Sequence, residues 1–299
     1  MKRLSAGDKF MYFVIYTSLG VLGFVTFYPF WNSVVISFNN GADTALGGVT
    51  FWPRDFTWDN YKIVFKDKRI VDGFIISILR TVVGTFLSIL STAILAYGMS
   101  RKELMHKKFY MVVCIFTMYF SGGLIPYFLL IRELGMMDTF WVMVIPGMIS
   151  VWNMIIFRTF FVGLPDGLEE SAKIDGSTNW GVFFRIALPL SGPVIATLSL
   201  FTAVYHWNDW FAPSIFINKA ELLPVQTKLK QILDSNIMSE QMSQMNAAGK
   251  AAMSRMKSSI TTKSLTMATM MVATVPIMLV YPFLQKYFVK GVLIGSLKE

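Results

Sequence analysis

The segment His206 to Trp210 brings together aromatic, amide and acidic side chains in five consecutive residues. On a helix, His206 and Asp209 lie one turn apart, and Trp207 and Trp210 share a face. Sugars are bound by such groups, because their rings stack on aromatic faces while amides and carboxylates hydrogen-bond to their hydroxyls. We therefore predict that His206, Trp207, Asn208 and Asp209 form part of a substrate path.

Two other interpretations of this cluster remain open. Tryptophans gather at membrane interfaces, so the cluster also fits an aromatic belt. A metal or acid-base site fits less well, because it needs more ligands than the chain's two histidines supply. Asn153, which follows Trp152, is a second candidate for the path, although a helix–helix hydrogen bond explains it equally well.

A second constellation is acidic and contains Glu169, Glu170 and Asp175. Gly176 follows them and interrupts helical propensity. The pattern predicts a helix, a bend and a second helix over about 165–188, with the acids facing a partner. The alternative is an interfacial amphipathic helix whose acids are solvated, but anionic lipid repels a helix with this many acids.

The amino-acid composition indicates which kind of structural element positions these residues. Hydrophobic residues make up 54% of the 299 residues and charged residues 15%, which is more apolar than an ordinary soluble domain. A membrane-spanning helix needs about 20 mostly apolar residues. Six runs meet this condition: about 11–38, 74–99, 109–131, 140–161, 193–216 and 265–288.

These runs predict an all-α, polytopic membrane helix bundle with six transmembrane helices, forming one domain over 1–299. The longest segment between runs, about 217–264, is expected to be an external loop that begins with an amphipathic helix near 222–237. The loop of about 39–73 is expected to form a small ordered cap. Cys114 is the only cysteine, which excludes an internal disulfide.

Basic residues favour cytoplasmic termini, because they crowd into short segments beside predicted spans. They are Lys2, Arg3, Lys9, Arg101, Lys102, Lys107 and Lys108. The net charge of +9 is divided among loops and accompanies no nucleic-acid-binding motif, so we expect no nucleic-acid partner. The chain also lacks a G-x-x-x-x-G-K-[ST] phosphate loop, so energy must come from another chain or an ion gradient.

The acidic segment begins a motif in which several residue types recur at fixed offsets, and a match at that many offsets is specific. Glu170, Ser171 and Ala172 are followed after three residues by Gly176 and, nine residues later, by Ile186-Ala187-Leu188-Pro189. This resembles the EAA signature of permease subunits of ABC importers, with Ser171 in place of the first alanine. The resemblance implies that the signature helix docks on an ATPase, with Glu170 near a basic residue and Gly176 allowing the bend.

Over nearly its whole length, the chain resembles the carbohydrate-type, MalG-like permeases. Trp207-Asn208 matches a recurring Trp-Asn of that group, and the ending from Tyr281 to Gly291, continuing to Gly295, resembles the LplC-like branch associated with complex oligosaccharides. The resemblance implies a type I ABC importer permease fold. It also implies that Lys290, Gly291 and Gly295 belong to a tail that reaches the ATPase.

By the same resemblance, the working unit contains a second homologous permease, two ATPase subunits and an extracytoplasmic sugar-binding protein. ATP and Mg are then held by the ATPase subunits, and this chain is expected to have no cofactor, metal or catalytic residue. The expected location is the bacterial cell membrane. An ion-coupled secondary transporter of a small polar solute is the alternative function, and a membrane-embedded enzyme is a third.

Overall fold

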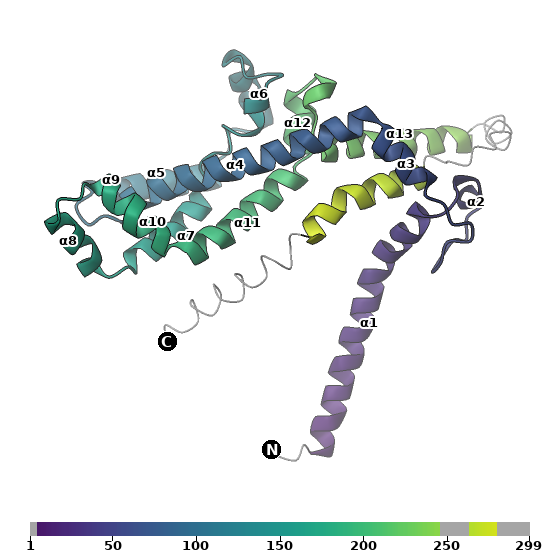
Figure 1. Ribbon diagram of the computed structural model, residues 1–299, viewed down its shortest axis with the longest axis horizontal. Helices are drawn as coiled ribbons and strands as arrows, with labels where there is room; N and C mark the ends of the chain where they lie inside the picture. Colours follow the sequence, from purple (N-terminus) through teal and green to yellow (C-terminus); the bar gives the residue numbers. More distant parts are fainter. Residues whose placement is uncertain (1–4, 246–262, 280–299) are drawn as a thin grey trace. The chain divides into compact units, whose positions relative to one another are not determined.

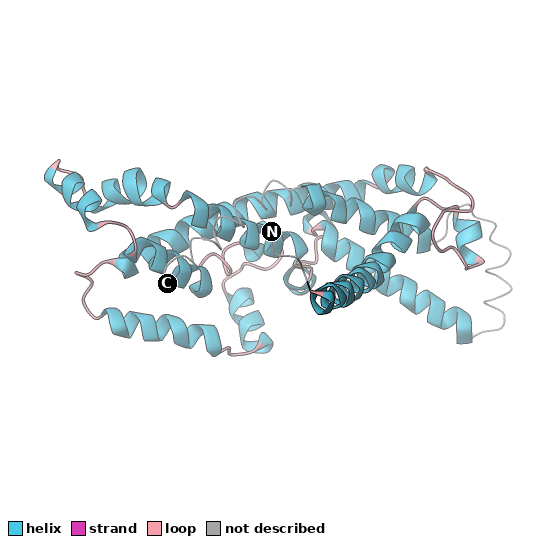
Figure 2. Ribbon diagram, turned by 90° about the horizontal axis from the view of Figure 1, so that it is seen from below, coloured by secondary structure: helices cyan, strands magenta, loops and turns pink. Residues whose placement is uncertain are grey.

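A computed structural model describes residues 5–245 and 263–279, and the regular elements in these ranges are helices. Figure 2 shows helices and loops throughout the described ranges. The predicted all-α class is therefore confirmed, whereas the single domain over 1–299 stays a prediction. The described residues divide into two compact units, 5–68 with 229–245 and 263–274, and 69–228 with 275–279.

The first unit begins with α1 (Ala6–Ser37), which is long and apolar enough to cross a membrane. Its start is fixed by Asp8, whose carboxylate accepts a hydrogen bond of 3.0 Å from the Ser5 N–H. The unit also contains α2 (Gly41–Ala45), α3 (Asp59–Lys66), most of α13 (Val225–Met245) and most of a helix over Lys263–Leu279. The helix predicted near 222–237 is present as α13 and is longer than expected, whereas its amphipathic character stays a prediction.

The predicted cap over 39–73 is ordered around Asn39, which is fully buried. Its Oδ1 atom accepts hydrogen bonds from the N–H groups of Arg54 and Asp55, at 2.8 and 3.0 Å. Its Nδ2 group donates to Asp43 and Thr44. A buried amide that uses its donors and acceptor in this way specifies one loop conformation.

The second unit carries the remaining elements, whose α-helices are labelled in Figure 1. They are α4 (Lys68–Ser100), α5 (Lys107–Tyr119), α6 (Leu124–Glu133), η1 (Phe140–Met143), α7 (Val151–Val162), α8 (Asp166–Ile174), α9 (Asn179–Val182), η2 (Phe183–Ala187), α10 (Leu188–Leu190), α11 (Gly192–Asn208), α12 (Phe211–Phe216) and η3 (Ala220–Leu222).

The main core of this unit lies among α4, α7, η2 and α11. Small residues of α4, Ala93 and Ala96, are fully buried and allow close helix approach. Large residues fill the space beside them, among them Phe157 of α7 and Phe183 of η2. A smaller core joins α6, η1 and α12 through Ile131, Met143 and Phe216, among other residues.

Two of the predicted spans, 11–38 and 74–99, are continuous helices within α1 and α4. Two more spans are present only if each of two bent helix pairs crosses the membrane as one unit: α5 with α6, bent by 110°, and the helices of 179–190 with α11, bent by 80°. The predicted six spans are therefore not established over the described residues.

The prediction of continuous helices over 109–131, 140–161 and 193–216 is wrong. Gly123, with φ +88°, breaks the first run between α5 and α6, and an L side chain rarely adopts this conformation. The second run contains only η1 and the 12-residue α7, with Pro146-Gly147 between them. The third is broken at Asp209, and the last described residue of the predicted run 265–288 is Leu279.

Candidate functional site

The acidic signature folds as a bracket, which we define as α8, the bend at 175–178 and α9. The bend is formed by Gly176 at φ +81°, where the N–H of Ser177 donates to the Ala172 carbonyl at 2.9 Å. Thr178 caps α9 by accepting from the Gly181 N–H at 3.2 Å. The predicted helix, bend and helix are confirmed.

One side of the bracket rests on the main core, as the apolar spacing predicts. Ala172 of α8 packs against that core, and Val182 at the end of α9 is buried in it. The apolar spacing predicts one buried stripe on each helix: Leu164, Leu168 and Ala172 on the first, and Trp180, Phe183, Phe184 and Ala187 on the second. Phe183 and Ala187 are buried, but neither stripe is complete, because Leu168 is 45% exposed and Trp180 is 59% exposed.

Glu169 does not face outward as predicted, because it forms an ion pair with Arg101, which directly follows α4. Both guanidinium ends of Arg101 contact the carboxylate, one of them at 2.6 Å. The side chains are 21% and 13% exposed, and the guanidinium also lies 4.1 Å from the centre of the Tyr97 ring. This contact ties the bracket to the end of α4.

The same end of α4 is capped by other basic side chains. Arg158 donates to the Met99 carbonyl at 3.2 Å, and Lys107 donates to the carbonyls of Ser100 and Arg101. Cations at a helix C-terminus satisfy its free carbonyls and interact favourably with its dipole. These contacts hold the backbone beside Arg101, and the ion pair with Glu169 holds its side chain.

Lys102 and Asp166 form an outer ion pair, 2.7 Å long, between the α4–α5 loop and α8. The hydrogen bond to Lys102 lowers the pKa of Asp166, and the hydrogen bond to Asp166 raises the pKa of Lys102. Since the Asp166 pKa is lowered on folding, this pair supports the fold above the ordinary aspartate pKa and is lost as pH falls through the lowered value. Both side chains are largely exposed, so the contribution is small.

The outer face of the bracket carries the remaining signature residues. Glu170, Ser171, Asp175 and Gly176 are all exposed. Between them lies Ile174, which is 86% exposed. Ile174 lies one helical turn after Glu170 and directly before Asp175, so the outer face of the bracket combines acidic and apolar side chains.

The structure brings together two of the predicted path residues, Asn153 and His206. Both line a cavity of about 360 Å³ between α4, α7 and α11. The Nδ2 group of Asn153 donates to Thr202 at 3.2 Å, and the Nδ1 atom of His206 is buried with no hydrogen-bond partner in the described residues. Tyr205 lies beside them with 61% of its surface exposed.

The other predicted path residues lie elsewhere. Trp207 lines an apolar pocket of about 320 Å³ together with residues such as Phe74 and Leu200. Asn208 is exposed, and Asp209 forms an ion pair with Arg80. The structure therefore divides the segment 206–209 between different surroundings instead of placing it along one wall.

Arg80 is buried within α4, with a side-chain exposure of 1%. It contacts the Asp209 carboxylate and also donates to the Asp209 carbonyl at 2.8 Å. The other carboxylate oxygen accepts from the N–H groups of Phe211 and Ala212, at the start of α12. Asp209 thus neutralises a buried cation and caps a helix at the break after α11.

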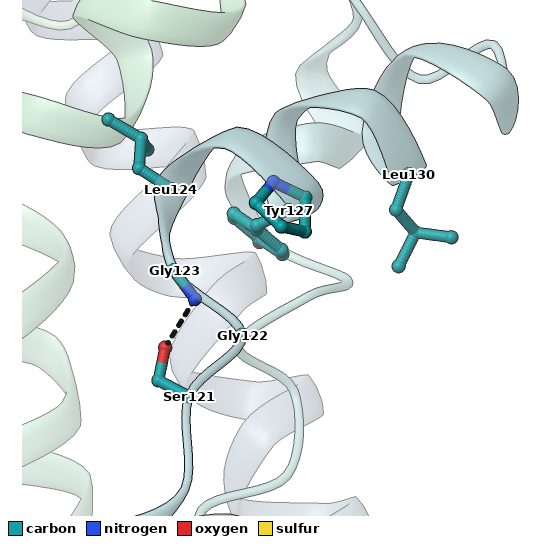
Figure 3. A pocket seen from close by; sticks show the side chains of 7 residues that line it. Ser121, Gly122, Gly123, Leu124, Tyr127 and Leu130 are labelled. Carbon is teal, nitrogen blue, oxygen red and sulfur yellow. Dashed lines mark hydrogen bonds between the residues drawn. The ribbon is translucent and has the colours of Figure 1, made fainter.

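A further hollow of about 510 Å³ lies at the bend between α5 and α6. Figure 3 shows Ser121 accepting a hydrogen bond from the Gly123 N–H beside Tyr127. Its lining is formed by one local segment, 121–130, so it reflects the bend itself. Within the described residues, no group of three His, Cys, Asp or Glu side chains is arranged to hold a metal ion.

Gly84 of α4 allows His206 to occupy its place in the cavity wall. A Cβ atom at Gly84 would lie 2.6 Å from Nε2 of His206, whose exposure is 2%. We therefore expect Gly84→Ala to displace the imidazole and to lower the stability of the protein by about 1–3 kcal/mol. Thermal unfolding of the purified protein measures this effect.

Gly98→Ala is the matched control on the same helix, since a Cβ atom at Gly98 meets nothing within 4 Å. Alanine has the higher helix propensity, so this variant is expected to be neutral or slightly stabilising. Equal unfolding temperatures for the two variants would show that the close contact with His206 is unimportant.

The chain matches, over residues 1–294, the family described as "Binding-protein-dependent transport system inner membrane component". The match covers far more than half of the 299 residues, so the chain belongs to this family. It is therefore a multi-pass membrane permease of the ABC importer type, and this class is one of transport proteins, not enzymes. Both the predicted family and the predicted fold are confirmed.

Particular relatives are similar along nearly their whole length. The polygalacturonan/rhamnogalacturonan transport system permease protein YtcP of Bacillus subtilis is 38% identical, with 95% of this chain and 97% of that protein covered. Protein LplC of the same organism is 41% identical, with 94% and 92% covered. A crystal structure of a bacterial ABC transporter that imports the acidic polysaccharide alginate contains a chain with 26% identity and a TM-score of 0.86, covering 96% of this chain and 100% of that one.

Proposed function

We propose that this permease forms half of the translocation path of an ATP-driven importer for an acidic oligosaccharide. Two relatives support this substrate class, the permease named for polygalacturonan and rhamnogalacturonan and the alginate transporter. The family match favours the importer over an ion-coupled secondary transporter. The sugar is delivered by an extracytoplasmic binding protein, in keeping with the family's description.

In this proposal the other half of the path is a second, homologous permease subunit, and two separate ATPase subunits hold ATP and Mg. The chain lies in the bacterial cell membrane with both termini in the cytoplasm. The proposed path follows α11 and includes Asn153 and His206. The predicted tail residues Lys290, Gly291 and Gly295 lie outside the described residues, and their contact with the ATPase remains part of the proposal.

The single observation that supports ATPase docking is the outer face of the bracket. Glu170 and Asp175 are exposed there beside Ile174, at the tip of an element whose other side is packed on the core. Acidic groups around an exposed apolar side chain match an interface with an apolar centre and a charged rim. A basic groove on the ATPase is the complementary surface.

We expect Glu170→Lys to weaken recovery of the ATPase subunits by more than about tenfold, because reversal of an interface charge costs about 2 kcal/mol or more. Co-purification of the ATPase with tagged permease from membranes measures this. Glu133→Lys is the control, because Glu133 is an exposed acid on α6, outside the bracket. Full ATPase recovery with Glu170→Lys would remove the docking assignment.

A further inference from the structure

The cavity between α4, α7 and α11 contains the groups that a single sugar ring requires. Four of its polar residues, Ser88, Asn153, Thr202 and His206, are at least nine-tenths buried. Tyr205 and Phe201, by contrast, are 61% and 47% exposed at the same cavity. Buried hydrogen-bonding groups therefore lie next to accessible aromatic faces.

The cavity has the size and polarity of a ligand-binding site, not those of a packing defect. Its volume of about 360 Å³ lies within the range of about 300–1,000 Å³ that is typical of ligand pockets. A buried imidazole nitrogen without a partner is costly, and His206 Nδ1 has none among the described residues. Because this atom is itself buried, a hydroxyl group in the cavity satisfies it once the imidazole turns toward the cavity.

The charge of the cavity indicates which part of a sugar is recognised. Among the described residues, the lining contains no acid, lysine or arginine. Arg80, which also lies on α4, is already paired with Asp209. A carboxylate would find no counter-ion here, whereas hydroxyl groups find serine, threonine, amide and imidazole partners.

We infer that this cavity is a subsite for one ring of the transported oligosaccharide, in which Tyr205 stacks on the ring face and Asn153, Thr202 and His206 bind its hydroxyl groups. The subsite rests on the proposed function, and it recognises the hydroxyl edge of a sugar instead of its carboxylate. Without an ion pair to break, the ring is released readily, as passage requires.

The test uses the complete importer in proteoliposomes with its binding protein, and radiolabelled tetragalacturonate as the probe. We expect Tyr205→Ala to lower ATP-dependent uptake by about tenfold or more, the effect of truncating a central aromatic contact. Tyr205→Phe keeps the ring and is expected to retain most of the uptake.

Phe86→Ala is the matched control, since Phe86 is an α4 aromatic that is 65% exposed and lies outside the cavity lining. Wild-type uptake by Tyr205→Ala, or an equal loss in Phe86→Ala, would overturn the subsite while leaving the importer function intact. Absence of ATP-dependent tetragalacturonate uptake by the wild-type complex would instead overturn the proposed substrate class, and the subsite with it.

Discussion

Replacing Arg80 by leucine is expected to destabilise the permease by about 3–5 kcal/mol, because Asp209 then keeps its charge without its partner. The effect should be large because the two side chains are only 1% and 11% exposed. The Asp209 carboxylate also caps α12, so its displacement affects the helix break as well as the ion pair. The midpoint of thermal unfolding and the yield of monodisperse protein measure the loss.

A double variant separates charge from packing. Arg80→Leu combined with Asp209→Asn removes both charges and keeps the Oδ1 acceptor that caps α12. We expect it to recover most of the lost stability, because a neutral pair leaves no unpaired charge in the interior. Arg132→Leu is the control, since its contact with Glu133 is exposed and 3.7 Å long. An unfolding midpoint for Arg80→Leu equal to that of the wild type would exclude a structural role for the pair.

Replacing Arg101 by glutamine is expected to separate ATP hydrolysis from sugar uptake. The Arg101–Glu169 contact joins the bracket to the end of α4, so its loss leaves the bracket docked but less firmly connected to the spans. A two-point, partly buried charged contact of this kind contributes about 1.5–3 kcal/mol. We expect near-normal ATP hydrolysis with uptake about tenfold lower.

Two further variants test whether this contact is the cause. The double variant Arg101→Glu with Glu169→Arg exchanges the two charges and restores an ion pair, so it is expected to recover part of the uptake. Lys102→Gln breaks only the exposed pair with Asp166 and is expected to have little effect. If Arg101→Gln and Lys102→Gln transported sugar equally well, the proposed connection between bracket and α4 would be refuted.

The bracket could be predicted from sequence because its signals are local. Glycine at 176 fits a left-handed bend, and the acids that precede it predict the exposed face of α8. The partner of Glu169 could not be predicted, since Arg101 lies 68 residues away and nothing in the local pattern distinguishes Glu169 from Glu170. The same holds for Arg80 and Asp209, which are 129 residues apart.

The span boundaries show another limit of apolar patterns. Hydrophobicity identifies residues that avoid water, but it does not show whether the backbone continues in one direction. The turn at Gly122-Gly123 and the break at Asp209 lie inside apolar runs, so both runs were predicted as single helices. The residues of the substrate path could not be predicted for a similar reason, because neighbours on α11 such as His206 and Trp207 line different cavities.

The ordered cap sets a sequence of events during assembly. Asn39 and Asp55 are joined across only 16 residues, whereas the Oδ1 atom of Asn60 accepts a hydrogen bond from Ser264, 204 residues later. Contacts between near neighbours form sooner than contacts between distant ones. The loop around Asn39 is therefore able to close while the chain is still being made. The hydrogen bond between Asn60 and Ser264 forms only after nearly all of the protein has been synthesised.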